Sequence, residues 1–422
     1  MKISKYNILV KYNNRSFVFN QLRLSLLELD NELAQAIELC NVDSIPQEQL
    51  ALLSANGIIC PQSLLEENVI LARDNLFRFS NSTARVTILP TLNCNFHCWY
   101  CYEDHYKSFI KNDNLEAIIS FCKKLIIGTN IKQFRLDWFG GEPLLYFNET
   151  IYPISKALLH YCLQNKIDFT NTITTNGYLI SPDIIEKMKE VQLKGFQITL
   201  DGGKEHHDKV RFTSKKGGSY NKIVTNITEL CHRIPNIDMM VRINYTPSNL
   251  KSLEEIASVF PIDIRSMIHI SPQMVWQYKD DAYSYTDIVG KKMKTFAKMG
   301  YKKSSFKLGC SPCYAENMKQ YVINYDLNVY KCTARKFQQN YSIGKILPNG
   351  DFCPNPHFYD FFQPASIQAE KCLKCYLLPS CLGNCIQKNI EKQPIQCRPE
   401  NMLEQVKQKV LLYLFQSGVL IN

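Results

Sequence analysis

The sequence predicts an α/β protein built on a partial (β/α)6 TIM-like barrel, with a small α+β unit before it and a cysteine-rich extension after it. Three observations predict this arrangement. Short apolar runs alternate with amphipathic helical stretches from residue 84 to about residue 305, and the first 82 residues lack this alternation. After about residue 305 a second group of closely spaced cysteines begins. We expect an N-terminal unit at 1–82, a barrel at 83–304, a cysteine-rich domain at 305–400 and a C-terminal helix at 401–422.

The N-terminal unit combines strand and helix patterns. Residues 6–12 and 15–20 alternate apolar and polar side chains and are joined by an Asn-Asn dipeptide, which predicts a hairpin. Residues 24–40 carry apolar side chains at helical spacing, and residues 46–57 are typical of a second helix that ends at a glycine.

Six strand–helix alternations follow, and they predict a parallel sheet with covering helices. In such folds the active site lies at the C-terminal ends of the strands, where the polar and glycine-rich motifs of this sequence also fall. The expected strands are 84–91, 133–140, 169–177, 196–203, 239–246 and 266–275. The expected helices include 114–126, 154–164, 181–191, 219–232 and 250–260.

Composition excludes several classes of protein. A hydrophobic content of 45%, a charged content of 21% and a formal net charge of +10 over 422 residues are ordinary, and they form no nucleic-acid footprint. The N-terminus lacks a signal peptide, and the longest apolar run is too short to span a membrane. We expect a cytoplasmic protein with no nucleic-acid and no membrane partner. The lysine-rich stretch 291–307 is either a solvated helix face or a docking surface for an acidic electron-transfer protein.

The seventeen cysteines need a reason, because disulfides are rare in a reducing compartment. Isolated cysteines are typical of buried apolar positions, and clustered ones favour metal or cluster ligation. We expect burial for Cys40, Cys60, Cys122, Cys162 and Cys231.

Cys94, Cys98 and Cys101 follow the first barrel strand within eight positions. Structural zinc normally takes four ligands; His97 is an available fourth, but so short a loop is poorly suited to surround one ion. A cluster held by three thiolates leaves one iron open, so that its last ligand would come from a cofactor.

At these residues the chain resembles the radical S-adenosylmethionine (radical SAM) enzymes, whose signature is three cysteines at this spacing. The resemblance implies a four-iron cluster that binds the amino and carboxylate groups of S-adenosylmethionine. Its electron would cleave the cofactor to a 5′-deoxyadenosyl radical, which abstracts hydrogen from a substrate. Tyr100 stands at the aromatic position that lies near the adenine in the family, although Trp99 and Tyr100 could instead pack the loop.

Two further motifs resemble the cofactor site of the family. In FGGEP, Gly140 and Gly141 allow close backbone approach to a ligand, and the resemblance gives Glu142 the contact to the methionine amino group. An isolated motif of this kind would more often be a turn. In TTNG, Thr175 and Asn176 resemble polar contacts to the cofactor.

The stretch ITLDGGKEHHDKVR resembles a third family motif, with Thr199 in place of the usual serine. Arg211 falls where the family places an arginine that reaches the cofactor carboxylate, a contact that suits a guanidinium. Asp201 could be structural, and His206 and His207 are expected to pack or to face solvent.

The later cysteines resemble the SPASM domain, an extension of some radical SAM enzymes that holds two auxiliary four-iron clusters. For any single Cys-x2-Cys pair the alternative is a structural zinc module. Two ligand spacings are shorter than usual, Leu327 replaces a usual glycine beside Asn328, which could adopt the turn, and Cys353 is a spare thiol. Carried over by position, the first auxiliary cluster takes Cys310, Cys313, Cys332 and Cys385, and the second takes Cys372, Cys375, Cys381 and Cys397.

The resemblance implies radical chemistry and leaves the substrate open. Thr333 stands where sulfatase-maturing relatives carry an aspartate, which counts against that reaction. Residues 1–82 resemble leader-recognition modules, which add an extended peptide to a sheet edge, or else they cap the barrel.

We therefore expect a maturase of ribosomally made peptides that forms a thioether, carbon–carbon or ether crosslink or a related modification. Its expected partners are a precursor peptide and an acidic electron donor such as a flavodoxin or ferredoxin. The alternatives are a sulfatase-maturing or small-molecule radical oxidoreductase and a non-catalytic zinc-binding scaffold. No general base stands out among Tyr245, His269 and Tyr314.

Overall fold

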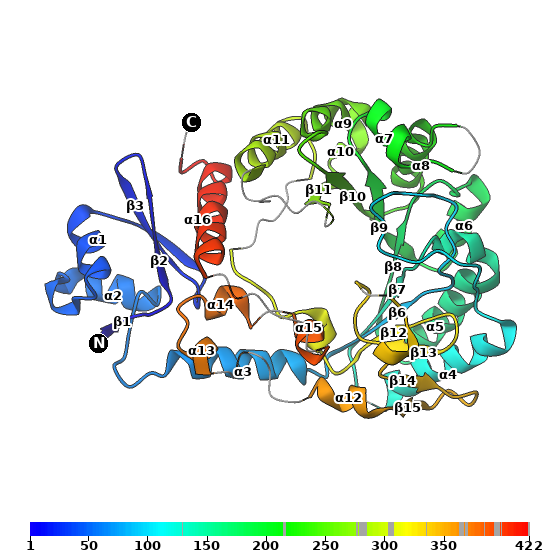
Figure 1. Cartoon of the computed structure of the whole chain (residues 1–422), viewed down its shortest axis with the longest axis horizontal. Coiled ribbons are helices and arrows are strands. Elements are labelled where there is room, and N and C mark those ends of the chain that lie inside the picture. Colours follow the sequence, from blue (N-terminus) through cyan, green and yellow to red (C-terminus); the bar gives the residue numbers. More distant parts are fainter. Residues whose placement is uncertain are drawn as a thin grey trace. The chain divides into compact units, whose positions relative to one another are not determined.

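The computed structural model divides the chain into two compact units (Figure 1). Unit 1 consists of Met1–Phe79, Ser305–Asn317 and Phe361–Asn422, and unit 2 consists of Ser80–Ser304 and Met318–Asp360. The structure describes residues 1–420 apart from 129, 214–216, 276, 278–284, 303–307, 335, 363–366, 368–369, 384, 392–396 and 398.

A ten-stranded sheet runs through the described part of unit 2, in the order β11-β10-β9-β8-β7-β6-β12-β13-β14-β15. Strands β6 to β11 are parallel neighbours in chain order, β12 adds to β6 in parallel, and the last three strands are antiparallel. The strands are β6 (Thr83–Ile88), β7 (Gln133–Trp138), β8 (Asp168–Thr175), β9 (Leu193–Leu200), β10 (Asp238–Tyr245), β11 (Ile268–Met274), β12 (Gln320–Ile323), β13 (Asn328–Tyr330), β14 (Gly344–Ile346) and β15 (Phe352–Pro354).

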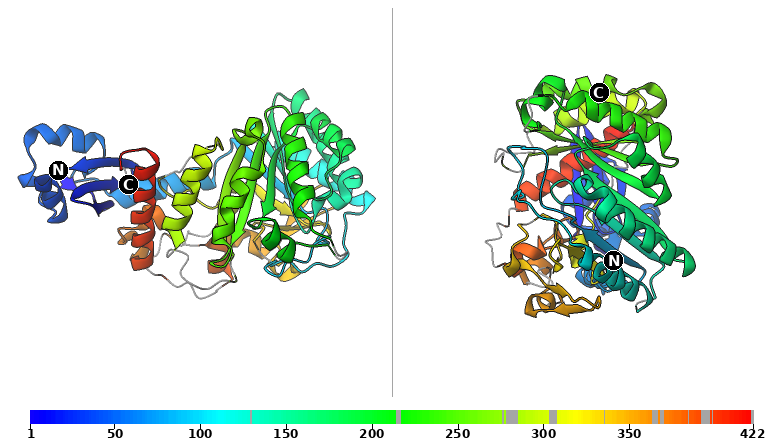
Figure 2. Two further views of the ribbon diagram at one scale, coloured as in Figure 1. Left: turned by 90° about the horizontal axis from the view of Figure 1, so that it is seen from above. Right: turned by 90° about the vertical axis from the view of Figure 1, so that its right-hand side faces the viewer.

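Helices of unit 2 lie along one face of this sheet (Figure 2). That face is apolar: Val86, Leu136 and Ile198 are fully buried on it. Burial of such side chains stabilises the packing by about 1.5–3 kcal/mol each. The helices are α4 (Asn112–Ile127), α5 (Tyr152–Gln164), α6 (Pro182–Glu190), α7 (Lys204–Val210), α8 (Tyr220–Arg233), α9 (Leu253–Val259), α10 (Ile262–Arg265), α11 (Thr286–Lys298) and α12 (Pro356–Asp360), with shorter turns at Pro143–Tyr146, Phe147–Ile151, Leu250–Ser252 and Gln339–Tyr341.

The six predicted parallel strands are confirmed, and with them the partial barrel. Strands β12 to β15 were not predicted, because strands of three or four residues are too short to show a period in the sequence. In the turn before β13, the residue with positive φ is Leu327 (+67°), and the suggestion that Asn328 adopts the turn is wrong. Leu327 thus holds a left-handed conformation that costs a non-glycine residue roughly 1–2 kcal/mol.

Unit 1 contains a three-stranded antiparallel sheet in the order β2-β3-β4. The predicted hairpin is confirmed, with Asn13 and Asn14 both at positive φ between β2 and β3. One face of the sheet packs on the C-terminal helix α16, and the other packs on α1 and α2. The strands are β2 (Asn7–Tyr12), β3 (Arg15–Asn20) and β4 (Ser25–Leu29). Two further short strands, β1 (Lys2–Ile3) and β5 (Ile59–Cys60), pair with each other in a separate antiparallel sheet.

The expected helix over residues 24–40 is wrong in its first half. Residues 25–29 form β4, because their leucines pair across β3, and helix α1 begins only after Asp30. The Asp30 carboxylate accepts a hydrogen bond from the amide of Leu33 at 2.8 Å, which caps the helix. The expectation for Cys40 is also wrong, since this residue is exposed at positive φ, whereas the other four isolated cysteines are buried as expected.

The remaining elements of unit 1 are helical and short, except for two. Helices α3 and α16 are the longer ones, and α16 packs Val406, Val410 and Leu414 into the core of the unit. The helices are α1 (Asn31–Glu38), α2 (Gln47–Ala55), α3 (Glu66–Arg78), α13 (Glu370–Leu373), α14 (Leu378–Cys381), α15 (Ile386–Ile390) and α16 (Pro399–Gln416), with turns at Val42–Ser44 and Tyr314–Glu316.

A buried ion cluster in unit 1 ties α3 to the turn at Tyr314–Glu316. The Arg78 guanidinium contacts the Asp74 carboxylate at 2.9 Å and the Glu316 carboxylate at 2.7 Å. All three side chains are at most 6% exposed. Glu316 in turn donates its backbone N–H to the carbonyl of Cys313 at 2.9 Å, so the cluster fixes the segment that carries Cys313.

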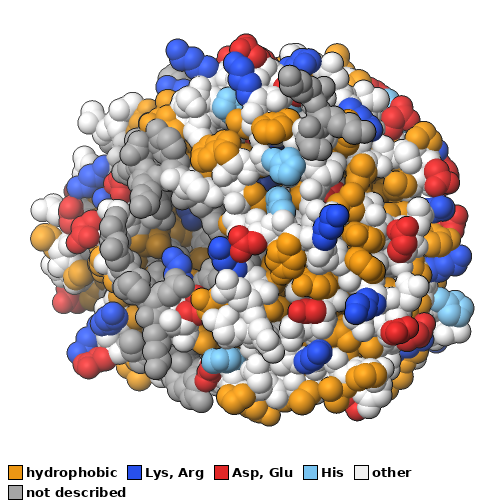
Figure 3. Space-filling view, turned by 45° about the vertical axis from the view of Figure 1, so that its right-hand side comes forward, with side chains coloured by type: hydrophobic (Ala, Val, Ile, Leu, Met, Phe, Trp, Pro, Cys, Tyr) orange, Lys and Arg blue, Asp and Glu red, His pale blue; other side chains and the backbone are white. Residues whose placement is uncertain are grey.

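Within the described residues no helix is long and apolar enough to cross a membrane. On the face drawn in Figure 3, basic and acidic side chains are intermixed. The residues described on this face therefore form no single-sign basic patch of the kind that nucleic-acid-binding proteins present.

Candidate active site

The loop with Cys94, Cys98 and Cys101 leaves the C-terminal end of β6, and backbone hydrogen bonds fix its start. The amide of Gly141 donates to the carbonyl of Thr91 at 3.1 Å, and the amide of Glu142 donates to the carbonyl of Asn93 at 2.8 Å. The start of the loop is therefore hydrogen-bonded to the FGGEP turn that comes after β7.

The two glycines of this turn are required by the loop itself. A Cβ atom added to Gly141 would lie 2.3 Å from the carbonyl oxygen of Asn93 and 2.5 Å from that of Leu92. Gly140 has φ of +113°, and its added Cβ would lie 2.4 Å from the carbonyl oxygen of Thr91. Residues 91–93 thus occupy the space beside both glycines, and approach to a ligand stays a prediction.

Glu142 is fully buried, and its carboxylate joins β7 to the end of β8. It accepts hydrogen bonds from the Thr175 hydroxyl at 2.6 Å, the Asn176 amide at 2.7 Å and the Leu144 amide at 3.0 Å. Burial raises the pKa of Glu142, and these three donors oppose that shift. The structure brings Glu142, Thr175 and Asn176 together through these hydrogen bonds, and their contacts to a cofactor stay a prediction.

Burial also raises the pKa of the loop thiols, to about 12 for Cys94 and about 11 for Cys101, with Cys98 shifted in the same direction. Binding of a cluster must therefore displace protons from these cysteines. The histidine beside a loop thiol is His105, whose Nε2 lies 3.3 Å from the Sγ atom of Cys101. For His97, which the sequence offered as a fourth ligand, the backbone amide donates to the carbonyl of Phe212 at 3.3 Å, and the ring lies 6.5 Å from the Phe212 ring.

In the part of the chain that is described, no three His, Cys, Asp or Glu side chains converge on a point that could hold one metal ion. The three thiolates of a four-iron cluster bind three different irons, so they need not converge in this way. The loop chemistry, three thiols on one short loop, therefore fits a cluster with one open iron.

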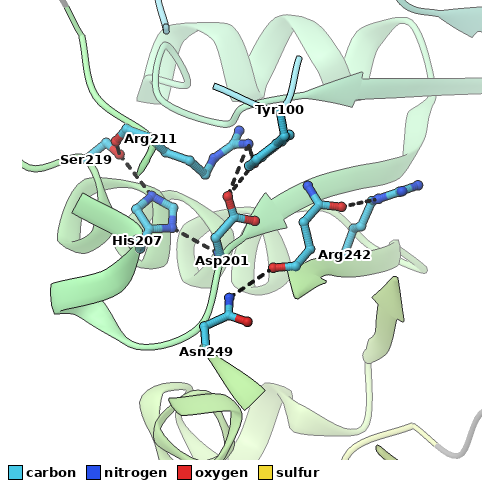
Figure 4. Close-up of polar contacts among 8 residues, drawn as sticks. Tyr100, Asp201, His207, Arg211, Ser219, Arg242 and Asn249 are labelled. Atoms are coloured by element: carbon cyan, nitrogen blue, oxygen red, sulfur yellow. Dashed lines mark hydrogen bonds and ion pairs between the residues drawn. The ribbon is translucent and has the colours of Figure 1, made fainter. Parts of the chain in front are cut away.

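Tyr100, Asp201 and Arg211 form a buried polar group at the ends of β6 and β9 (Figure 4). The Arg211 guanidinium donates to the Tyr100 hydroxyl at 2.7 Å and lies 3.9 Å from the Asp201 carboxylate, to which that hydroxyl donates in turn. The guanidinium also lies over the ring of Phe96, 5.5 Å from its centroid. Burial raises the pKa of Asp201, and the Arg211 charge opposes the shift.

His207 supports this group from behind and is fully buried. Its Nδ1 accepts the backbone N–H of Asp201 at 3.2 Å, and its Nε2 lies 2.9 Å from the Ser219 hydroxyl. Because Ser219 donates its own proton to the carbonyl of Arg211, His207 donates from Nε2 and is neutral. Burial accordingly lowers the pKa of His207 to about 3.

The site holds two buried polar atoms that have no partner in the described residues, Oδ1 of Asp201 and Nε of Arg211. Such atoms are rare in folded proteins and indicate a place for a polar ligand. An amino acid moiety carries both an ammonium and a carboxylate, so it suits a site that offers the carboxylates of Glu142 and Asp201 as well as the guanidinium of Arg211. The residues present therefore fit S-adenosylmethionine.

Arg211, Tyr100 and Glu142 were predicted from the sequence, whereas the importance of two other residues was not. Asp201 lies at the centre of the polar group, and His207 packs as expected but also orients the end of β9. The only signal for either residue was its place in the ITLDGGKEHHDKVR motif, because both roles depend on contacts between segments distant in the chain.

The C-terminal cysteines divide between the units. Cys332 and Cys353 lie in unit 2, where Cys332 is buried and Cys353 is exposed on β15. The C-terminal cysteines that belong to unit 1 lie on short helices or on the loops beside them, and they are Cys310, Cys313, Cys372, Cys375, Cys381, Cys385 and Cys397. Their grouping into two clusters stays a prediction.

Comparison with known proteins agrees with the site. Residues 88–259 match the model of the radical SAM superfamily. The radical SAM cyclopropyl synthase TigE of Paramaledivibacter caminithermalis is 25% identical over 224 residues, which are 44% of this chain and 46% of TigE. The cysteine-type anaerobic sulfatase-maturating enzyme of Clostridium novyi is 36% identical over 148 residues, which are 32% of this chain and 37% of that enzyme. The chain thus spans about half, or less, of the length of these curated relatives.

A solved structure shares the fold over most of the chain. SuiB of Streptococcus suis, bound to its precursor peptide SuiA, superposes with a TM-score of 0.52 at 16% identity, covering 95% of this chain and 100% of SuiB. The fold, the three-cysteine loop and the matched superfamily agree with one another. Residues 88–259, which carry the three-cysteine loop and the buried polar group, are therefore a radical SAM domain of an iron–sulfur enzyme.

Proposed function

We propose that this chain modifies a ribosomally made precursor peptide by radical chemistry, leading to a thioether, carbon–carbon or ether crosslink or a related modification. The observation that carries the proposal is the buried group of Glu142, Asp201 and Arg211 beside a loop of three cysteines at the C-terminal edge of a parallel sheet. The similarity to SuiB, which binds a precursor peptide, supports a peptide substrate.

Each residue of the site has a separate proposed role. Cys94, Cys98 and Cys101 would hold a four-iron cluster which, with S-adenosylmethionine, supplies a 5′-deoxyadenosyl radical when bound. Arg211 would bind the carboxylate of the cofactor, and Glu142 its ammonium. Tyr100 fixes the direction of the guanidinium through its 2.7 Å hydrogen bond.

Water must be excluded from a radical site, and in this chain hydrogen bonds between the loop and the sheet would close the site. Asn176 is buried and spans from the Glu142 carboxylate to the Asn95 side chain at 2.7 Å, which closes the loop against β8. The roles of Gly140, Gly141 and Thr175 follow from the same contacts: the glycines admit the loop, and the threonine hydroxyl holds Glu142.

We assign two auxiliary four-iron clusters to the C-terminal cysteines. The support is their number and spacing, which resemble the SPASM domain, and the similarity to SuiB over nearly the whole chain. The proposed ligands are Cys310, Cys313, Cys332 and Cys385 for the first cluster, and Cys372, Cys375, Cys381 and Cys397 for the second.

We assign leader recognition to the N-terminal sheet. Within the described residues β4 pairs with β3 alone, so its other edge is a site where an extended peptide could add as a strand. Arg15 and Glu28 form a salt bridge across β3 and β4, at 2.7 Å, so the charged end of this edge is internally balanced. A mainly apolar or uncharged leader segment is therefore the better match to β4.

An acidic electron donor such as a flavodoxin or ferredoxin is the proposed source of electrons. Among the lysines of α11 and its surroundings, Lys292 pairs with Glu254 and Lys302 pairs with Asp238 at 3.2 Å. The charge of the stretch 291–307 is therefore partly neutralised, and residues 303–307 lie outside the described part. The lysine-rich stretch stays the proposed docking surface.

Anaerobic purification with iron and sulfide quantitation tests the proposal first. We expect about twelve irons per chain, and about eight in a Cys94/Cys98/Cys101→Ala variant. Cys162→Ala is the matched control, because Cys162 is fully buried on α5 in the same unit. Reduced enzyme should form 5′-deoxyadenosine from S-adenosylmethionine, and the triple variant should form none.

Each alternative predicts a different result. Zinc without iron would indicate a non-catalytic scaffold. A wild-type content of about four irons would exclude the assignment of two auxiliary clusters. Turnover of a small molecule with no response to any precursor peptide would indicate a radical oxidoreductase. Formylglycine in a sulfatase peptide would indicate sulfatase maturation, against which Thr333 counts.

A further inference from the structure

The face of the unit 2 sheet opposite its helices is polar, which is unusual for parallel strands. Parallel strands covered on both faces read as continuous apolar runs. Here each strand from β6 to β11 alternates instead, with a buried apolar residue on the helix side and a less buried, mostly polar residue on the other. We call this second face the inner face. Its side chains point away from the covering helices.

The inner face carries an excess of positive charge. Away from the strand ends, its charged residues are Arg85, Arg135, Asp137 and Arg242. Asp137 accepts from Nε of Arg135 at 2.9 Å and also pairs with Arg85. One carboxylate is thus shared by two guanidinium groups, which remain 34% and 41% exposed.

Arg242 has no carboxylate of its own. Its neighbours on β9 and β11 are Thr199 and Ser271, and its Nε donates to the side-chain oxygen of Asn244 at 2.9 Å (Figure 4). Within the described residues no carboxylate lies within ion-pair distance of Arg242. Its half-buried guanidinium lies near Tyr100 and Asp201, next to the proposed cofactor site, and burial lowers its pKa.

An unpaired guanidinium in a partly dry place costs free energy unless an anion binds it. Arg211 is already proposed to bind the carboxylate of the cofactor. No anion has been assigned to Arg242. The inner face leads from Arg242 on β10 across the sheet to Arg135 and Arg85 on β7 and β6.

We propose that Arg242 binds a carboxylate of the substrate peptide, an Asp or Glu side chain next to the modified residue, and thereby selects acidic peptides. The inference rests on the proposed function and names the substrate class for it. Arg85 and Arg135 contribute a positive field along the same face. A guanidinium can hold a carboxylate through two parallel hydrogen bonds, which fixes the position of the peptide as well as its charge.

The test uses reconstituted holoenzyme and an equimolar library of random heptapeptides. Bound peptides are separated from free ones and sequenced by mass spectrometry. We expect wild type to enrich Asp or Glu over Asn or Gln by about tenfold, as a charge-assisted pair suggests. Arg242→Gln should lose this preference, Arg242→Glu should favour Lys and Arg, and Arg242→Lys should retain part of it.

Arg233→Gln is the matched control, because Arg233 pairs with Glu186 on the helix side of the unit and should bind the library as wild type does. An unchanged acidic preference in Arg242→Gln would overturn the inference, as would a wild type that enriches no acidic residue. A rise in the Kd for S-adenosylmethionine with an unchanged library profile would place Arg242 in the cofactor site and also overturn it. The proposed function fails separately, if reduced wild type forms no 5′-deoxyadenosine.

Discussion

Replacing Arg78 by methionine should strongly destabilise unit 1. The substitution keeps much of the side-chain volume and removes the charge that Asp74 and Glu316 share. Those carboxylates are only 4% and 5% exposed, so water cannot replace the guanidinium. Breaking a buried pair by removing one partner typically costs about 3–5 kcal/mol.

Thermal unfolding measures this loss against a surface control. For a unit of this size each kcal/mol shifts Tm by about 2–4 °C, so Arg78→Met should lower the Tm of unit 1 by roughly 6–20 °C. Lys11→Met removes an ion pair whose side chains are 61% and 56% exposed, and it should cost at most about 1 kcal/mol. Hydrogen exchange at α3 and at residues 314–317 would assign the transition to unit 1.

The pH dependence gives a second test of the same cluster. Burial raises the pKa of both Asp74 and Glu316, and the Arg78 charge opposes that shift. Without Arg78 both pKa values rise further. A carboxyl group with a raised pKa in the folded state stabilises below its unfolded pKa and loses that contribution as pH rises through the folded value. The deficit of Arg78→Met should therefore shrink as the pH falls from 7 towards 4.

A loss below about 1 kcal/mol would refute the reasoning, as would a deficit that does not change with pH. The variant Asp74→Asn/Arg78→Met/Glu316→Gln separates charge from packing. It leaves no buried charge at the site, so it should recover part of the stability lost in Arg78→Met. Because the cluster fixes the segment with Cys313, Arg78→Met should also reduce the iron content of the reconstituted protein.

Three further substitutions probe the loop, a strained turn and the buried histidine. Gly141→Ala would place a Cβ 2.3 Å from a loop carbonyl and should lose about four irons, whereas Gly217→Ala, which meets nothing within 4 Å, should lose none. Leu327→Gly relieves roughly 1–2 kcal/mol of backbone strain but uncovers the space of a leucine that is 5% exposed, worth about 2–5 kcal/mol, so denaturant unfolding should show a net loss. The lowered pKa of His207 means that stability falls as pH drops from about 6.5 towards 3, and His207→Gln should flatten this slope in Tm measured against pH.

The parallel strands were predictable because each is long and its flanking helices are amphipathic. The shorter elements were not. Strand β4 has leucines that also fit a helical period, and only its pairing with β3 decides between the two. The partner of Arg78 shows the same limit: Asp74 stands one helical turn away in the sequence, but Glu316 is 238 residues away and reaches α3 only in the folded chain.

The candidate site divides in the same way. Cys94, Cys98 and Cys101 were visible because their ligand spacing lies within one loop. The partners of Glu142 were not visible, because Thr175 and Asn176 follow another strand and meet it only when β7 and β8 pair. Motif order along the chain indicated that these segments belong together, while the hydrogen bonds that join them come from the sheet.

The two faces of the unit 2 sheet explain how one fold can carry both stability and specificity. Val241 and Ile243, the neighbours of Arg242 on β10, are fully buried on the helix side, so they carry the packing energy of that strand. Arg242 itself points to the other face and contributes little apolar burial. Truncating Val241 to alanine should therefore lower stability by about 1–3 kcal/mol with an unchanged peptide preference, whereas Arg242→Gln should change the preference at little cost in stability. If both variants lost stability alike, the inner face would be part of the core, and the charge on it would need a structural explanation.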